Sequence, residues 1–185
     1  MTRLLPLLVV ACSSTPLPEA PPSLASFDRV LPRADGCLDT FLFAGPTGDR
    51  QLVTLNFGDG LADDACAAAG PITRTYAWND PSLDLELLVG RRLSINYCTD
   101  AIQSGRRVTG RAQPTSGTVT VTYSPSASST TQEPVGTANV SIEGVTWQWT
   151  TGGTITQAEP WTFSTYVDIA FPSWDTGDPA RPCLP

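Results

Sequence analysis

A period-two alternation of apolar and polar side chains recurs along this 185-residue chain and limits what it can fold into. Successive side chains of an extended strand point to opposite faces, so this period is typical of a sheet with one buried face. The alternation is clearest in five segments: residues 50–57, 83–87, 118–123, 139–150 and 161–171. The sequence therefore predicts a chain built mainly of β-strands.

Interruptions of the pattern predict where the strands bend and end. Gly144 lies where the alternation of residues 139–150 changes phase, which indicates a bend or a bulge. Residues 151–153 have the composition of a hairpin turn, and only residues 59–69 look helical, with Gly70 placed to end the helix. We therefore expect an all-β fold, an antiparallel β-sandwich of jelly-roll or immunoglobulin-like type with one short helix. A closed β-barrel is the main alternative.

The N-terminus carries a short motif of its own. An apolar run from Leu4 to Val10 follows Arg3 and closes on Val9-Val10-Ala11-Cys12, with Ser13 directly after the cysteine. This segment resembles the lipobox of bacterial lipoproteins, in which a peptidase cuts before a cysteine that then carries a diacylglycerol and an acylated amino group. The resemblance implies a signal peptide over residues 1–11 and lipidation of Cys12. The alternative is that the run is a buried strand that happens to end in cysteine.

The same resemblance implies a location. A lipoprotein lies on a membrane surface outside the reducing cytoplasm, and Ser13 after the cysteine is similar to outer-membrane lipoproteins, which lack an inner-membrane retention aspartate at that position. We therefore expect a protein of the cell envelope, attached to the outer membrane by its lipid and either periplasmic or exposed on the surface.

With this motif included, we expect the chain to consist of three parts. Residues 1–11 are the signal peptide, and residues 12–35 are a lipidated, proline-rich tether that reaches at most roughly 60 to 70 Å. Residues 36–185 are the β-sandwich domain with a proline-rich C-terminal tail. A domain of this length can bury a sizeable core.

Composition narrows the chemistry open to the protein. All eleven basic residues are arginine, and there is no histidine, so imidazole bases, imidazole metal ligands, Schiff-base lysines and the P-loop lysine are excluded. We expect no cofactor and no metal centre. The net charge of −7 argues against a nucleic-acid partner. The doublets Arg91-Arg92 and Arg106-Arg107 are interpreted as solvated strand or loop ends.

Residues 36–171 also show a compositional resemblance. The arginine-only basic set, the alanine, proline and aspartate bias, and the strands rich in threonine and valine behind a lipobox are similar to the β-rich domains of uncharacterised lipoproteins from predatory Gram-negative bacteria. This resemblance implies an address and an architecture, and it implies no activity and no functional residues.

Four cysteines remain once Cys12 is assigned to lipid, namely Cys37, Cys66, Cys98 and Cys183. An even number in an exported protein indicates disulfides, and three pairings are possible. Four free thiols are the alternative, and the spacing argues against a zinc cluster. We expect Cys37 to pair with Cys98 and Cys66 with Cys183, because these bridges would join each end of the domain to its body.

Two groups of side chains on single strand faces are candidates for function. Trp147 and Trp149 project from one face and could stack on sugar rings, although Val145 on that face favours core packing. Asp84 and Glu86 share a face and could act as paired acids, but alternation with leucines favours solvated carboxylates.

Two further acidic segments have ordinary structural explanations. Asp59, Asp63 and Asp64 surround a glycine turn and offer oxygens for calcium, yet a helix start explains them more readily. The triplet Asp175-Thr176-Gly177 matches aspartic proteases but lies in a proline-rich tail, where a turn is favoured.

These patterns predict a lipid-anchored, non-catalytic module of the cell envelope, whose partner is the membrane and, at its surface, a glycan or protein not identified by the sequence. Two alternatives stay open. One is a carboxylate-based hydrolase acting on glycans, and the other is a barrel that carries an apolar ligand.

Overall fold

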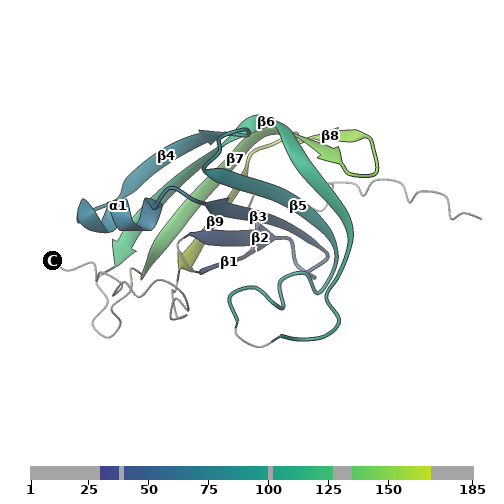
Figure 1. Cartoon of the computed structure of the whole chain (residues 1–185), viewed down its shortest axis with the longest axis horizontal. Coiled ribbons are helices and arrows are strands. Elements are labelled where there is room, and N and C mark those ends of the chain that lie inside the picture. Colours follow the sequence, from purple (N-terminus) through teal and green to yellow (C-terminus); the bar gives the residue numbers. More distant parts are fainter. Residues whose placement is uncertain (1–29, 38–39, 100–101, 127–134, 168–185) are drawn as a thin grey trace, which may run out of the picture.

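The computed structural model describes residues 30–37, 40–99, 102–126 and 135–167 of the chain, shown in Figure 1. These residues form nine strands and one short helix, so the predicted all-β class is confirmed. In chain order the elements are β1 (Arg33–Cys37), β2 (Phe41–Gly45), β3 (Gln51–Phe57), α1 (Leu61–Ala67), β4 (Ile72–Ala77), β5 (Leu83–Arg91), β6 (Arg107–Ser126), β7 (Val135–Trp149), β8 (Thr154–Thr156) and β9 (Trp161–Val167).

All nine strands belong to one mixed sheet, in the order β4-β6-β5-β3-β2-β1-β9-β7-β8. An additional pairing of β6 with β7 joins strands from the two ends of this order, so seven strands from β6 round to β7 form a closed ring of hydrogen-bonded neighbours. The neighbours are antiparallel except for β1 and β9, which are parallel. One ring-like sheet therefore takes the place of the two packed sheets expected of a sandwich.

The two longest strands, β6 and β7, make this closure possible. Along one edge β6 pairs first with β5 and then with β4, while its other edge pairs with β7 from Ala112 to Ser126. The β6–β7 register shifts between Pro114 and Thr118, opposite Gly144, which has a φ of +63°. The predicted bend at Gly144 is confirmed, and it lets both strands curve round the ring.

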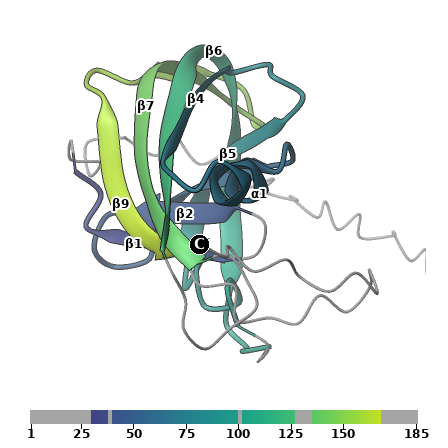
Figure 2. The ribbon, with the colours of Figure 1, turned by 90° about the vertical axis from the view of Figure 1, so that its left-hand side faces the viewer.

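Apolar side chains of α1 and of strands β2, β3, β4, β5, β6, β7 and β9 fill the ring interior, and Ala34 of β1 and Ile155 of β8 pack against them. They come from the inward positions of the alternating segments, such as Val53, Leu85, Val121 and Ile142. The helix α1 lies at one end of the ring, where it buries Leu61, Ala62 and Ala65, and Figure 2 shows the ring from that end. Within the part of the chain that the structure describes, no helix has the length and apolar character needed to span a membrane.

A second, smaller apolar cluster lies on the outer face of β2, β3 and β5. Phe43, Leu52 and Leu88 point away from the ring interior and pack against Leu93 of the segment between β5 and β6. Strand β3 is therefore buried on both faces over Leu52–Leu55. We call residues 92–106 the β5–β6 loop.

The observed elements correct several expected boundaries. Val30 bridges to Thr162, Leu31 is buried, and β1 begins at Arg33, so the tether boundary predicted at residue 36 is too late. Residues 30–35 belong to the domain because they close the ring against β9. The helix is confirmed but shorter, beginning after Gly60, whose φ is +68°. Strands β1, β2, β4 and β8 and the first half of β6 were not predicted.

Candidate functional site

The two tryptophans predicted as a possible binding platform lie in the core. Trp147 and Trp149 are 0% and 2% exposed, and the Trp147 ring stacks on Trp161 with centroids 5.9 Å apart. The platform interpretation is therefore wrong for this pair, and core packing, which Val145 on the same face favoured, is correct. Trp78 keeps 40% of its surface exposed on the outside of the molecule.

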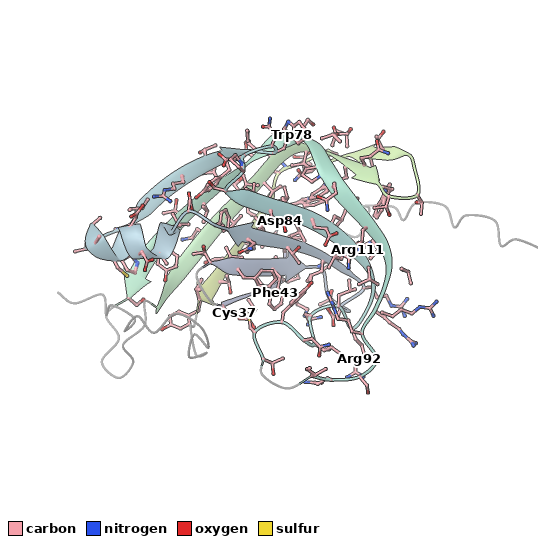
Figure 3. All side chains as sticks on the ribbon, viewed as in Figure 1. Cys37, Phe43, Trp78, Asp84, Arg92 and Arg111 are labelled. Carbon is pink, nitrogen blue, oxygen red and sulfur yellow. A yellow bond between two sulfur atoms is a disulfide. The ribbon has the colours of Figure 1, made fainter. Side chains whose placement is uncertain are left out.

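Of the predicted acid pair on β5, Glu86 is held by neighbouring polar side chains and Asp84 is exposed. Both carboxylate oxygens of Glu86 accept hydrogen bonds from Arg111 Nη1 at 2.9 Å, and Gln113 approaches the same carboxylate at 3.4 Å. Figure 3 shows Asp84 and Arg111 on the outer surface of the sheet. Glu86 is therefore engaged in an ion pair rather than simply solvated.

The acids near α1 are bound by an arginine. Arg74 lies 2.7 Å from the Asp59 carboxylate, also pairs with Asp64, and donates to the Asp59 carbonyl at 3.2 Å. Tyr76 donates to Oδ2 of the Asp59 carboxylate at 2.8 Å, and burial, together with this bond, raises the pKa of Tyr76 to about 12. The group joins α1 to β4. Among the described residues no set of three or more acids, cysteines or histidines is arranged to hold a metal ion.

A disulfide holds the β5–β6 loop against the outer face of the sheet. Cys37 of β1 is bonded to Cys98, as predicted, with their Cα atoms 5.4 Å apart. Beside the bridge, Tyr97 packs on Phe41 and Phe43 with ring centroids 5.0 and 5.4 Å apart. Cys66 is also disulfide-bonded. Its predicted partner, Cys183, lies outside the described residues, so that pairing stays a prediction.

Arg106 supports the loop from within. Its guanidinium lies over the Tyr97 ring at 4.7 Å from the centroid and donates to the carbonyl of Leu93 at 2.9 Å. Burial raises the pKa of Tyr97 above its ordinary value, although Arg106 opposes the shift. The loop is therefore fixed by a covalent bond, an aromatic cluster and a half-buried cation together.

The arginine doublets, predicted to be solvated strand or loop ends, meet in the fold. Arg91 and Arg107 face each other as partners in the β5–β6 pair, and Arg92 and Arg106 follow at the two ends of the loop. Arg50 comes next to them, because its carbonyl accepts from Gly90 N–H at 2.9 Å. A hairpin joining residues 83–91 to 107–112 would have revealed this grouping, but no alternation marks the first half of β6.

Arg33 completes this group, which we call the arginine end: Arg33, Arg50, Arg91, Arg92, Arg106 and Arg107. Arg33 donates to Ser94 of the loop at 3.1 Å and lies 3.7 Å from Asp49. A shallow hollow beside the loop is lined by Arg33, Asp49, Phe43, Leu52 and Ser94. Figure 3 shows Arg92 at the foot of the loop, away from α1.

Two predicted sites fall outside the description. Cys12 and the triplet Asp175-Thr176-Gly177 lie outside the described residues, so the lipidation site and the protease-like triplet have no structural account here. No protein-family model, curated protein or solved structure matches the chain.

Proposed function

We propose that the protein is a lipid-anchored lipoprotein of the cell envelope, held at the outer membrane through Cys12, and that its domain acts as a non-catalytic binding or structural module. The Cys37–Cys98 disulfide is the observation that carries this proposal. Structural disulfides persist in oxidising compartments and are rare in the cytosol, which agrees with the export that the lipobox-like segment implies.

The state of the polar groups supports a non-catalytic role. Glu86 of the candidate acid pair is engaged by Arg111, and Asp59 and Asp64 near α1 are engaged by Arg74. A carboxylate that accepts a charge-assisted hydrogen bond has its charge compensated and its position fixed by structure. These contacts explain the carboxylates as parts of the fold.

The packing of the ring supports a surface role over carriage of an apolar ligand. A carrier would line a cavity with its aromatic side chains, whereas Trp147 and Trp161 stack on each other in the interior. The interior is occupied by the protein's own side chains, so a partner would be met on the outside.

The anchor is tested by expressing the full chain in a Gram-negative host and partitioning the membranes with detergent. We expect the wild-type protein in the detergent phase, with a mass that shows cleavage before Cys12 and the addition of acyl chains. Cys12→Ser should give the uncleaved, unmodified chain. Cys98→Ser, a matched loss of one thiol inside the domain, should still be lipidated. Recovery of the wild-type chain from the aqueous phase with an unmodified mass would overturn the proposal.

A further inference from the structure

The arginine end carries an excess of positive charge, although the protein as a whole is acidic. Its six arginines are accompanied by Asp35 and Asp49, whereas the whole chain has a net charge of −7. The rest of the chain is therefore strongly acidic, so positive and negative charge are separated along the molecule. Such a distribution orients a protein in the field of an anionic surface.

Three of these arginines are available to a ligand. Arg50, Arg91 and Arg107 are exposed, and among the described residues none of them forms an ion pair. Arg91 and Arg107 are cross-strand partners, so two like charges are held side by side at a cost in stability. Binding of an anionic group would remove this repulsion.

An exposed apolar side chain lies on the same loop. Ile102 is 95% exposed, although large hydrophobic side chains of the neighbouring cluster are buried. It comes directly before residues 103–105, which contact the start of the loop: Gln103 N–H donates to Asn96, and Arg92 donates to the carbonyl of Ser104 at 3.1 Å. The contact between Arg92 and Ser104 lies two residues from Ile102. An exposed apolar side chain close in sequence to a cationic contact is a combination suited to the headgroup region of an anionic lipid bilayer.

The chain enters the domain at this same end. Arg33, the first residue of β1, pairs with Gly45, the last residue of β2, and the next strands continue with Ala44 opposite Val53 and Gln51 opposite Val89. These residues mark the edge of the sheet at which Arg50, Arg91 and Arg107 also lie. A lipid at Cys12 would therefore be joined to the domain at its positive end.

We propose that the arginine end docks on an anionic lipid surface, with Arg50, Arg91 and Arg107 on lipid phosphate groups and Ile102 inserted among the headgroups. This docking rests on the proposed function, which places the domain at a membrane. Tethering raises the local concentration of lipid, so weak docking is sufficient to orient the domain with its acidic surface turned outward.

The test uses the full chain carrying Cys12→Ser, which cannot be lipidated. Any binding to vesicles is then independent of the lipid anchor, and its outcome is separate from that of the anchor experiment. Co-sedimentation is measured with vesicles of phosphatidylcholine alone and of phosphatidylcholine with an equal part of phosphatidylglycerol. The apolar run at residues 4–10 is common to all variants, so binding to phosphatidylcholine alone measures its contribution. We expect additional binding to the anionic vesicles that weakens from about 0.1 M to about 1 M salt.

Variants locate the contact. Arg91→Gln with Arg107→Gln should weaken the additional binding about 25-fold, from about fivefold for each arginine near the surface. Ile102→Ser should weaken it about tenfold. The matched control is Thr75→Glu with Ser164→Glu, which lowers the net charge equally at exposed sites on β4 and β9 and should change binding less than about threefold. Unchanged tryptophan emission shows that each variant is folded.

Three outcomes would overturn the inference. The first is no additional binding to anionic vesicles at low salt. The second is an equal loss in the arginine variant and in the Thr75/Ser164 control, which would assign the effect to net charge. The third is equally tight binding of soluble polyglutamate, which would assign the arginine end to an acidic protein partner instead of a lipid surface.

Discussion

At the scale of single residues, burial decides what a side chain contributes. The tryptophans show this plainly, because Trp147 is fully buried and stacked on Trp161, whereas Trp78 is 40% exposed. Removing a large buried side chain costs its transfer free energy and leaves a cavity behind. Removing a half-exposed ring costs much less.

We predict that Trp147→Ala lowers the free energy of unfolding by about 3 to 5 kcal/mol. Trp78→Ala, the matched control, should lower it by less than about 1.5 kcal/mol. Urea unfolding followed by circular dichroism measures both. Equal losses in the two variants would contradict the assignment of Trp147 to the core.

A second residue-scale prediction concerns alkaline pH. Burial raises the pKa values of Tyr76 and Tyr123 to about 12, above the ordinary value of 10.0. Between pH 10 and pH 12 the unfolded chain loses these protons while the folded chain keeps them. The stabilisation is therefore complete below pH 10 and is lost as the pH rises toward 12, by roughly 2 to 3 kcal/mol for each tyrosine.

The measurement is the urea midpoint at pH 8 and at several values between pH 10 and pH 12. Tyr76→Phe should lose the hydrogen bond to Asp59 and so be less stable at pH 8, yet its stability should depend less steeply on pH above 10. A wild-type midpoint that stays constant up to pH 12 would argue against buried, neutral tyrosines.

At the scale of elements, the β5–β6 loop is held in place by its contacts with neighbouring strands. Its apolar side chain Leu93 packs on β2, β3 and β5, and Cys98 is bonded to β1. The loop in turn covers Phe43 and Leu52, which would otherwise expose apolar surface on the outer face of the sheet. Loop and sheet therefore stabilise each other through one small cluster and one covalent bond.

We predict that Cys98→Ser loosens this loop without unfolding the ring. The bridge closes a loop of 61 residues, for which the chain-entropy model gives about 4 kcal/mol. Trypsin should then cut the folded variant after Arg92 or Arg106, while the wild-type domain resists. Hydrogen exchange should rise in residues 92–99 and stay low in β7 and β9. Global loss of the β-sheet signal would mean that the bridge is needed for the ring itself.

At the scale of the whole molecule, closure of the ring depends on contacts far apart in the sequence. Strand β1 meets β9 through Gly36 and Val167, and Val30 bridges to Thr162. Folding must close this long loop before the contacts repay the lost chain entropy. The same closure separates the molecule into an end covered by α1 and an end that carries the arginines.

Much of the fold was predictable from local pattern. The five alternating segments coincide with parts of β3, β5, β6, β7 and β9, and the helix and the bend at Gly144 were recognised from glycine positions. These features depend on local rules, because side-chain period and backbone freedom act within a few residues. Strand β1, with the sequence Arg-Ala-Asp-Gly-Cys, has no alternation and is a strand because it fits between β2 and β9.

Local patterns in the amino-acid sequence were sufficient to predict the all-β class, to exclude imidazole and lysine chemistry, to recognise the lipobox-like motif and to limit the four remaining cysteines to three possible pairings. The folded chain was needed to show that one sheet closes on itself, that Trp147 and Trp149 face inward, and that two arginine doublets meet at one end. Alternation shows only which side chains share a face. Which face is buried, and which distant residues become neighbours, depends on strand pairing across the whole chain.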